Sequence, residues 1–165
     1  MVENLPVVGI VMGSDSDLET MKKCGEQLTA FGIAWEMRII SAHRTPQTAH
    51  EYSTTAAGRG LKVIIAAAGM SAALAGVMAA GTTLPVIGVP MAAGPLNGID
   101  AMLSTLQMPP GVPVASMAIG SAGATNAAIL AAQILALSDS ALAAKLVQFK
   151  QDQARKVAEK DAAIR

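Results

Sequence analysis

Apolar runs and amphipathic stretches alternate along this chain. Five short runs are rich in Val, Ile, Ala and Met and are bounded by Gly, Pro or polar residues, as strands are; they occupy residues 6–12, 34–40, 62–67, 85–89 and 114–119. Apolar positions at helical spacing follow each run, over residues 18–31, 46–59, 71–80, 98–108 and 126–138. The pattern therefore predicts strands that alternate with helices.

These elements predict an α/β fold with a five-stranded parallel sheet. Each connection between strands is long enough to hold a helix, and parallel strands need such connections. Right-handed crossovers place helices on both faces of the sheet, and strands covered on both faces are continuously apolar, as most of these runs are. No linker or shift in composition divides the chain, so we expect a single domain over residues 1–165.

The last segment, residues 138–165, is predicted to form an extended C-terminal helix. Ser138 is the expected N-cap, and one face of the helix carries Leu142, Leu146, Phe149 and Gln153. This segment is densely charged, whereas the preceding helix has almost no charge. We therefore expect the terminal helix to pack on a neighbouring subunit.

Composition excludes several classes of function. Twelve basic and 12 acidic residues cancel, so the chain lacks the positive field that nucleic-acid binding needs. Gly and Pro interrupt every apolar stretch before about 18 residues, which argues against a membrane span. The single Cys24 indicates a reduced, cytoplasmic compartment. A hydrophobic share of 52% is more than one small domain needs and predicts a homo-oligomer.

Chemically active side chains are scarce, yet they gather in the segments that follow the predicted strands. Ligands of open α/β sheets bind beyond the carboxyl ends of the strands. The segments in question are residues 13–17, 41–46, 68–71, 90–98 and 120–126. We expect the functional site to be built from them.

The first of these segments offers Ser14, Ser16 and Asp17 after the turn residue Gly13. Free N–H groups at a helix N-terminus favour a phosphate there, and Asp17 suits ribose hydroxyls. Capping of the helix by these side chains is an equally good interpretation. The segment matches neither a Gly-x-Gly-x-x-Gly motif nor a Walker loop.

The second segment places His43 beside Arg44 at a strand end. Histidine exchanges protons near neutral pH, and arginine offers a two-pronged donor for phosphate or carboxylate. His50 lies inside the next helix and is interpreted as a surface or packing residue. The two His and the one Cys show no close pairing in the sequence, so no transition-metal site is expected.

Two further segments are less specific. Met70 and Ser71, followed by two alanines, indicate either a wall for a small uncharged molecule or ordinary packing. Asn126 either caps a helix or touches a ligand.

Taken together, the motifs are similar to those of one family. They read GSDSD at 13–17, SAHRTP at 41–46, PVIGVP at 85–90, QMPPGVPVA at 107–115 and ATNAAILAAQIL at 124–135. Over roughly residues 7–148 the chain resembles the N5-carboxyaminoimidazole ribonucleotide mutases, bacterial enzymes of purine biosynthesis. SAHRTP and the QMP-G-PVA run carry most of the specificity.

The resemblance implies a flavodoxin-like three-layer sandwich, an octamer with active sites shared between subunits, and no cofactor or metal. It implies that Ser14, Ser16 and Asp17 hold the ribose phosphate end of a nucleotide. Ser41 and Arg44 would add phosphate contacts, while backbone groups of Ala68 and Gly69 would face the migrating carboxylate. The rest of the implied substrate-binding set is Gly13, Ala42, Met70, Ser71 and Leu74.

The implied reaction moves a carboxylate from the exocyclic nitrogen to C4 of aminoimidazole ribonucleotide. His43 would protonate the nitrogen as CO2 departs, and an apolar pocket would keep CO2 until C4 attacks it. His43 would then remove the C4 proton, so that one residue serves as acid and base.

The chain departs from the family at residues 70–75. Mutases usually carry a second histidine where this chain has Ala73 and a proline where it has Ala75. A sister class, which carboxylates aminoimidazole ribonucleotide directly with CO2, also lacks that histidine and has Ser near position 71. That class typically has Lys where this chain has Arg44, and Arg where this chain has Met70. The mutase is the predicted function, and the direct CO2-dependent carboxylase is the alternative.

A non-enzymatic, flavodoxin-like nucleotide-binding module is a more distant alternative. One Trp and one Tyr are too few aromatics to sandwich a flavin readily. A phospho-receiver would need a lysine after the fifth strand, and the segment from Gly120 to Asn126 has none.

Overall fold

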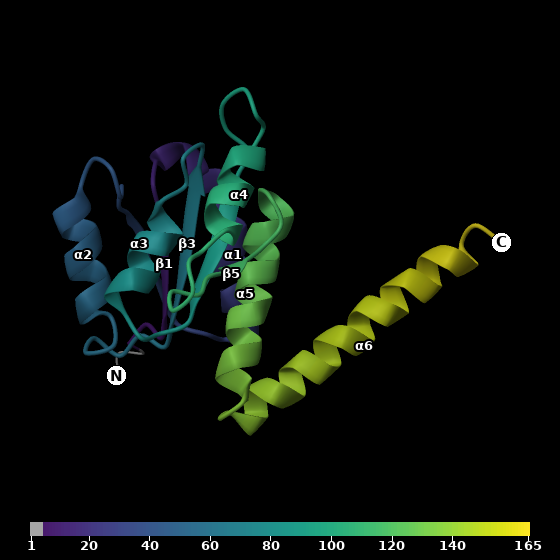
Figure 1. Ribbon diagram of the computed structural model, residues 1–165. Helices are drawn as coiled ribbons and strands as arrows, with labels where there is room; N and C mark the ends of the chain where they lie inside the picture. The colour runs from purple at the N-terminus through teal and green to yellow at the C-terminus, as the bar shows by residue number, and fades with distance from the viewer. Residues whose placement is uncertain (1–4) are drawn as a thin grey trace.

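A five-stranded parallel sheet lies between two layers of helices in the computed structural model, which describes residues 5–165 (Figure 1). Residues 1–4 of the predicted domain lie outside the described part. The strand order is β2-β1-β3-β4-β5, the flavodoxin-like order of a doubly wound sheet. The strands are β1 Val8–Met12, β2 Trp35–Ile39, β3 Val63–Gly69, β4 Val86–Met91 and β5 Ala115–Ser116. The predicted α/β sandwich is thus confirmed.

The two faces of the sheet are covered by different helices. One face packs against α1 (Leu18–Phe31), α5 (Ser121–Ala136) and the start of α6 (Ser140–Ala162). The other packs against α2 (Pro46–Thr55), α3 (Leu74–Gly81) and α4 (Ile99–Leu106). Because neighbouring strand residues point to opposite faces, Ile10 and Met12 join the first core and Val11 joins the second.

The C-terminal helix α6 is attached to the body by its first turns. The rings of Phe149 and Phe31 meet edge to face at 5.3 Å, and Lys145 donates to the carbonyl of Phe31 at 2.8 Å. Beyond Phe149 the helix projects away from the sheet, and Gln153 is exposed (Figure 1). The extended helix is confirmed, but its predicted cap is wrong: Asp139 rather than Ser138 accepts from the N–H of Leu142.

Two helix starts also differ from their predicted positions. Helix α5 begins at Ser121 rather than at residue 126, since buried Gly123 lets the helix pass against the carbonyl of Ala118, where a Cβ would overlap it. Asn126 is therefore an exposed residue inside the helix and not a cap. Helix α3 begins at Leu74 rather than at Ser71, which leaves residues 71–73 in the loop.

The fifth strand is shorter than the predicted run 114–119. It pairs only with β4, over Ala115 and Ser116. The carbonyls of Gly88 and Pro90 accept from the N–H groups of Met117 and Gly120. Pro90 has no N–H that could donate to β5, so the regular hydrogen-bond ladder between β4 and β5 ends there.

A buried tyrosine joins α2 to the edge strand β2. The hydroxyl of Tyr52 donates to Glu36 at 2.7 Å, and Arg59 donates to the same carboxylate at 2.6 Å while lying 4.5 Å from the tyrosine ring. Partial burial by itself would raise the pKa of Glu36, but these two hydrogen bonds together with the positive charges of Arg59 and Arg38 outweigh it, so the pKa lies below its usual 4.5. Tyr52 reaches Glu36 across Gly9 of β1, where a Cβ would overlap the hydroxyl oxygen.

We expect Gly9→Ala to lower the free energy of unfolding by about 2 kcal/mol, because the added methyl group displaces the Tyr52 hydroxyl. The same substitution in a Tyr52→Phe background is expected to cost less than half as much. Urea unfolding of the two single variants and the double variant, at one protomer concentration, measures this coupling. Equal costs in both backgrounds would show that the hydroxyl is not the obstacle.

Candidate active site

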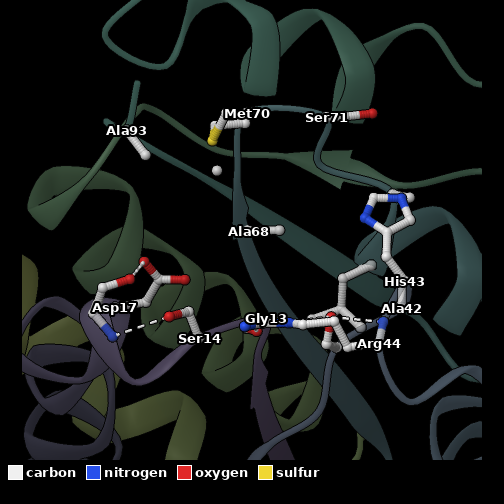
Figure 2. Close-up of a pocket in the computed structure, with 15 residues that line it drawn as sticks. Gly13, Ser14, Asp17, Ala42, His43, Arg44, Ala68, Met70, Ser71 and Ala93 are labelled. Carbon is white, nitrogen blue, oxygen red and sulfur yellow. Dashed lines mark hydrogen bonds between the residues drawn. The ribbon is translucent and has the colours of Figure 1, made fainter. Parts of the chain in front are cut away.

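A cavity of about 410 Å³ opens at the carboxyl edge of the sheet, between the loops that follow β1, β2, β3 and β4 (Figure 2). All of the residues predicted for the site line it. The lining residues are Gly13, Ser14, Ser16, Asp17, Ser41, Ala42, His43, Arg44, Ala68, Gly69, Met70, Ser71, Ala73, Leu74 and Ala93. The rule that ligands bind beyond strand ends therefore located this cavity.

The loop after β1 forms a short 3-10 helix, Asp15–Asp17, which leads into α1. Ser14 caps it: its hydroxyl oxygen accepts from the N–H of Ser16 at 3.3 Å. Asp17 makes no such cap; its buried carboxylate accepts from the hydroxyl of Ser16 at 3.2 Å. Burial raises the pKa of Asp17, the Ser16 hydrogen bond opposes this rise, and the charge of Asp15 adds to it. A ligand hydroxyl donating to Asp17 would relieve this desolvation.

The loop after β2 is a tight turn that presents His43 and Arg44. The N–H of Thr45 donates to the carbonyl of Ser41 at 2.9 Å, and the Thr45 hydroxyl accepts from the N–H of Ser41 at 3.0 Å. Pro46 then starts α2 with a φ already suited to a helix. Both functional side chains are exposed at the cavity wall.

Arg44 links this loop to the loop after β1. Its Nη2 donates to the carbonyl of Gly13 at 2.7 Å, and its Nε donates to the Ser41 hydroxyl at 3.3 Å. Among the residues that line the cavity in the described chain, Arg44 is the one Lys or Arg and Asp17 the one carboxylate. The cavity thus has a cation fixed in place beside hydroxyls, which suits a phosphate or carboxylate.

His43 is the one imidazole on the cavity wall, as far as the described residues go. In Figure 2 its ring stands apart from the Arg44 side chain, on the side nearer Ser71. His50 lies in α2, is exposed and does not line the cavity, which agrees with the surface interpretation.

The opposite wall is apolar and made of small residues. Ala68 and Gly69 end β3. Met70 and Ala93 lie above Ala68 in the view of Figure 2, opposite Gly13 and Arg44. A Cβ on Gly69 would lie 2.8 Å from the Cβ of Ala93, so only glycine lets these two loops approach so closely. The cavity therefore has one polar and one apolar side.

Two lining residues were not in the predicted set, Ala73 and Ala93. Ala93 belongs to the segment after β4, which the strand-end rule had indicated, but alanine carries no chemistry that would single it out. The segment from Gly120 to Asn126 contributes no lining residue to this cavity, so contact of Asn126 with a ligand stays a prediction.

Within residues 5–165 no three His, Cys, Asp or Glu side chains gather in a way that could hold a metal ion. No helix in the same part of the chain is long and apolar enough to cross a bilayer.

Comparison with known proteins agrees with this architecture. The sequence profile described as AIR carboxylase matches residues 7–156. The N5-carboxyaminoimidazole ribonucleotide mutase of Pyrococcus abyssi is 53% identical over 151 residues, covering 92% of this chain and 86% of the relative. The mutase of Bacillus subtilis is 53% identical over 154 residues, covering 93% and 95%.

A solved structure is similar over nearly the whole chain. The crystal structure of Treponema denticola PurE superposes with a TM-score of 0.82 at 33% identity, over 95% of this chain and 97% of that one. Sequence and structure thus agree on one relationship. The chain belongs to the AIR carboxylase family.

Proposed function

We propose that this protein is an N5-carboxyaminoimidazole ribonucleotide mutase of purine biosynthesis. The observation that carries this proposal is one cavity in which His43 and Arg44 face an apolar wall of small residues. Two relatives that match more than 90% of the chain, at 92% and 93%, bear the name of this mutase.

The polar side of the cavity binds the ribose phosphate. Arg44 and the hydroxyls of Ser14 and Ser41 surround a space suited to the phosphate, with the Arg44 guanidinium already held by Gly13. Asp17 accepts hydrogen bonds from the ribose hydroxyls, which replace the water it lost on burial. The nucleotide base then lies between His43 and the apolar wall.

His43 carries the proton. As the bond between the exocyclic nitrogen and the carboxyl carbon breaks, its electron pair stays on nitrogen, which takes a proton from imidazolium, and CO2 leaves uncharged. C4 attacks CO2 with its π electrons, and the neutral imidazole removes the C4 proton. The imidazole ends protonated as it began, with the proton from C4 in place of the one that it gave to nitrogen, so the reaction needs no net acid or base.

The direct CO2-dependent carboxylase remains the second candidate because Ala73 stands on the cavity wall where mutases usually have a histidine. Each candidate starts from a different nucleotide.

We expect rapid conversion of N5-carboxyaminoimidazole ribonucleotide, and little use of aminoimidazole ribonucleotide at modest bicarbonate concentration. The reason is that a mutase carries its CO2 into the cavity as part of the substrate, whereas a carboxylase must capture it from solution. Absorbance assays with each nucleotide supplied separately measure the two rates. A preference for aminoimidazole ribonucleotide would establish the carboxylase instead.

We expect His43→Asn to keep the fold and the oligomer but to lose at least about a hundredfold in kcat, because asparagine cannot exchange the proton. His50→Asn is the matched control, since His50 is exposed on α2 outside the cavity. Steady-state kinetics and circular dichroism of both variants measure the effects. Near-normal turnover by His43→Asn would contradict this mechanism.

We further propose that the enzyme works as a cytoplasmic homo-oligomer, an octamer, with α4 in a subunit interface. Four large apolar side chains on α4 and the loop before it are between 47% and 56% exposed: Leu96, Ile99, Leu103 and Leu106. Such a cluster supports burial against another copy of the chain, because isolated domains rarely expose contiguous apolar patches.

We expect Leu103→Glu to reduce the mass measured by size-exclusion chromatography with light scattering, since a buried, unpaired carboxylate opposes association. Leu5→Glu, at a leucine that is 66% exposed and outside α4, is the control and is expected to leave the octamer intact. If the Leu103→Glu variant is still an octamer, α4 does not lie in a subunit interface.

A further inference from the structure

Met70 occupies a distinctive place on the apolar side of the cavity. It follows β3 directly and lines the cavity, yet it is 54% exposed. Its side chain lies along Gly94 of the loop after β4: a Cβ on Gly94 would be 3.3 Å from Cγ and 3.7 Å from Cε of Met70. Met70 thus spans from one loop to the other at the cavity mouth.

The backbone of Met70 is also unusual. Its φ is +56°, and within residues 5–165 Asn97 is the only other non-glycine residue with a positive φ. A methionine in this left-handed region is strained, because its Cβ crowds the following carbonyl. Strained residues persist where surrounding structure holds them in place, and they gather at functional sites. The conformation places a long apolar side chain where glycine would leave the cavity open.

The chemistry of the proposed mutase needs a cover at this place. CO2 released from nitrogen is small and uncharged, so Arg44 cannot hold it as it holds an anion. Only exclusion from solvent keeps it near C4 until the new bond forms. Met70 and Ala93 lie on the side of the cavity opposite Gly13 and Arg44, where the polar end of the nucleotide is proposed to bind (Figure 2).

We propose that Met70 decides the fate of this CO2: its side chain closes the apolar side of the cavity, favouring carboxylation of C4 over escape to solvent. The inference rests on the proposed function and adds a determinant of reaction outcome to it. Methionine suits this role because it is apolar and has three rotatable bonds, so it can settle on a bound base. The bonds broken and formed are those of the mutase reaction itself.

An isotope experiment tests the role of Met70. N5-carboxyaminoimidazole ribonucleotide of natural isotopic composition is supplied with ¹³C-bicarbonate and carbonic anhydrase, so that any CO2 that escapes is exchanged for labelled CO2. Mass spectrometry of the C4-carboxylated product at early times, corrected with a blank lacking enzyme, gives the fraction labelled. Release of aminoimidazole ribonucleotide is measured in parallel.

We expect wild-type product to keep its original carboxyl group, and Met70→Ala to raise the labelled fraction about tenfold, a typical effect of removing apolar contact in a pocket. Nucleotide KM should change less than the labelled fraction, because the phosphate and ribose are proposed to bind on the polar side of the cavity and Met70 lines the apolar side. Met70→Leu should restore retention. Met70→Gly suits the positive φ, so it folds and should leak as much as Met70→Ala. Asn97→Gly relieves a similar strain outside the cavity and should resemble wild type.

The outcomes distinguish failure of the proposed role of Met70 from failure of the proposed mutase function. Equal labelling by wild type, Met70→Ala and Met70→Gly, with an active wild type, would overturn the role of Met70 and leave the mutase intact. If Asn97→Gly loses as much CO2 to solvent as Met70→Gly does, the loss results from relieved loop strain, and the proposed role of Met70 is overturned. A wild type that converts no N5-carboxyaminoimidazole ribonucleotide would refute the proposed function instead.

Discussion

The backbone of Gly13 joins three segments that border the cavity, the loops after β1 and β2 and the strand β3. Its N–H donates to the carbonyl of Ala67 at 3.0 Å, which fixes the end of β1 to the end of β3. Its carbonyl accepts from Nη2 of Arg44 at 2.7 Å, which fixes the loop after β2 to the same point. The positions of His43 and Arg44 relative to the end of β3 depend on this junction, because the two side chains lie in the loop after β2 and Ala68 and Gly69 end β3.

The cavity combines a polar side and an apolar side. Arg44 and Asp17 supply one charge of each sign on one side, and small residues ending β3 form the other side. Low overall charge therefore does not conflict with binding a nucleotide, since one fixed guanidinium and a few hydroxyls suffice for one phosphate. The apolar side offers a wall without charges, where uncharged CO2 is proposed to be kept from solvent. The proposed chemistry needs both.

The sequence predicted which residues line the cavity better than it predicted where the helices and strands end. Motifs such as SAHRTP lie in loops, and parallel strands bring their carboxyl ends to one edge, so His43, Arg44 and Asp17 could be placed together without coordinates. Helix starts depend on packing that local sequence does not reveal. Buried Gly123 lets α5 begin early against Ala118, and Asp139 rather than Ser138 reaches the free N–H of Leu142. Ala93 could not be predicted as a lining residue, because the methyl group of alanine has no chemistry of its own and its role depends on its neighbours in the fold.

The sequence alone determined the layered fold, the edge of the sheet where the cavity lies and the polar side chains that line it, because periodicity and residue type act locally and survive in any α/β arrangement. Tertiary structure alone decided that Arg44 turns onto the carbonyl of Gly13, that burial raises the pKa of Asp17, and that Met70 lies along Gly94 with a positive φ. Each of these depends on two or three loops meeting in space. Distances between loops are set by packing across the sheet, which a linear pattern does not encode.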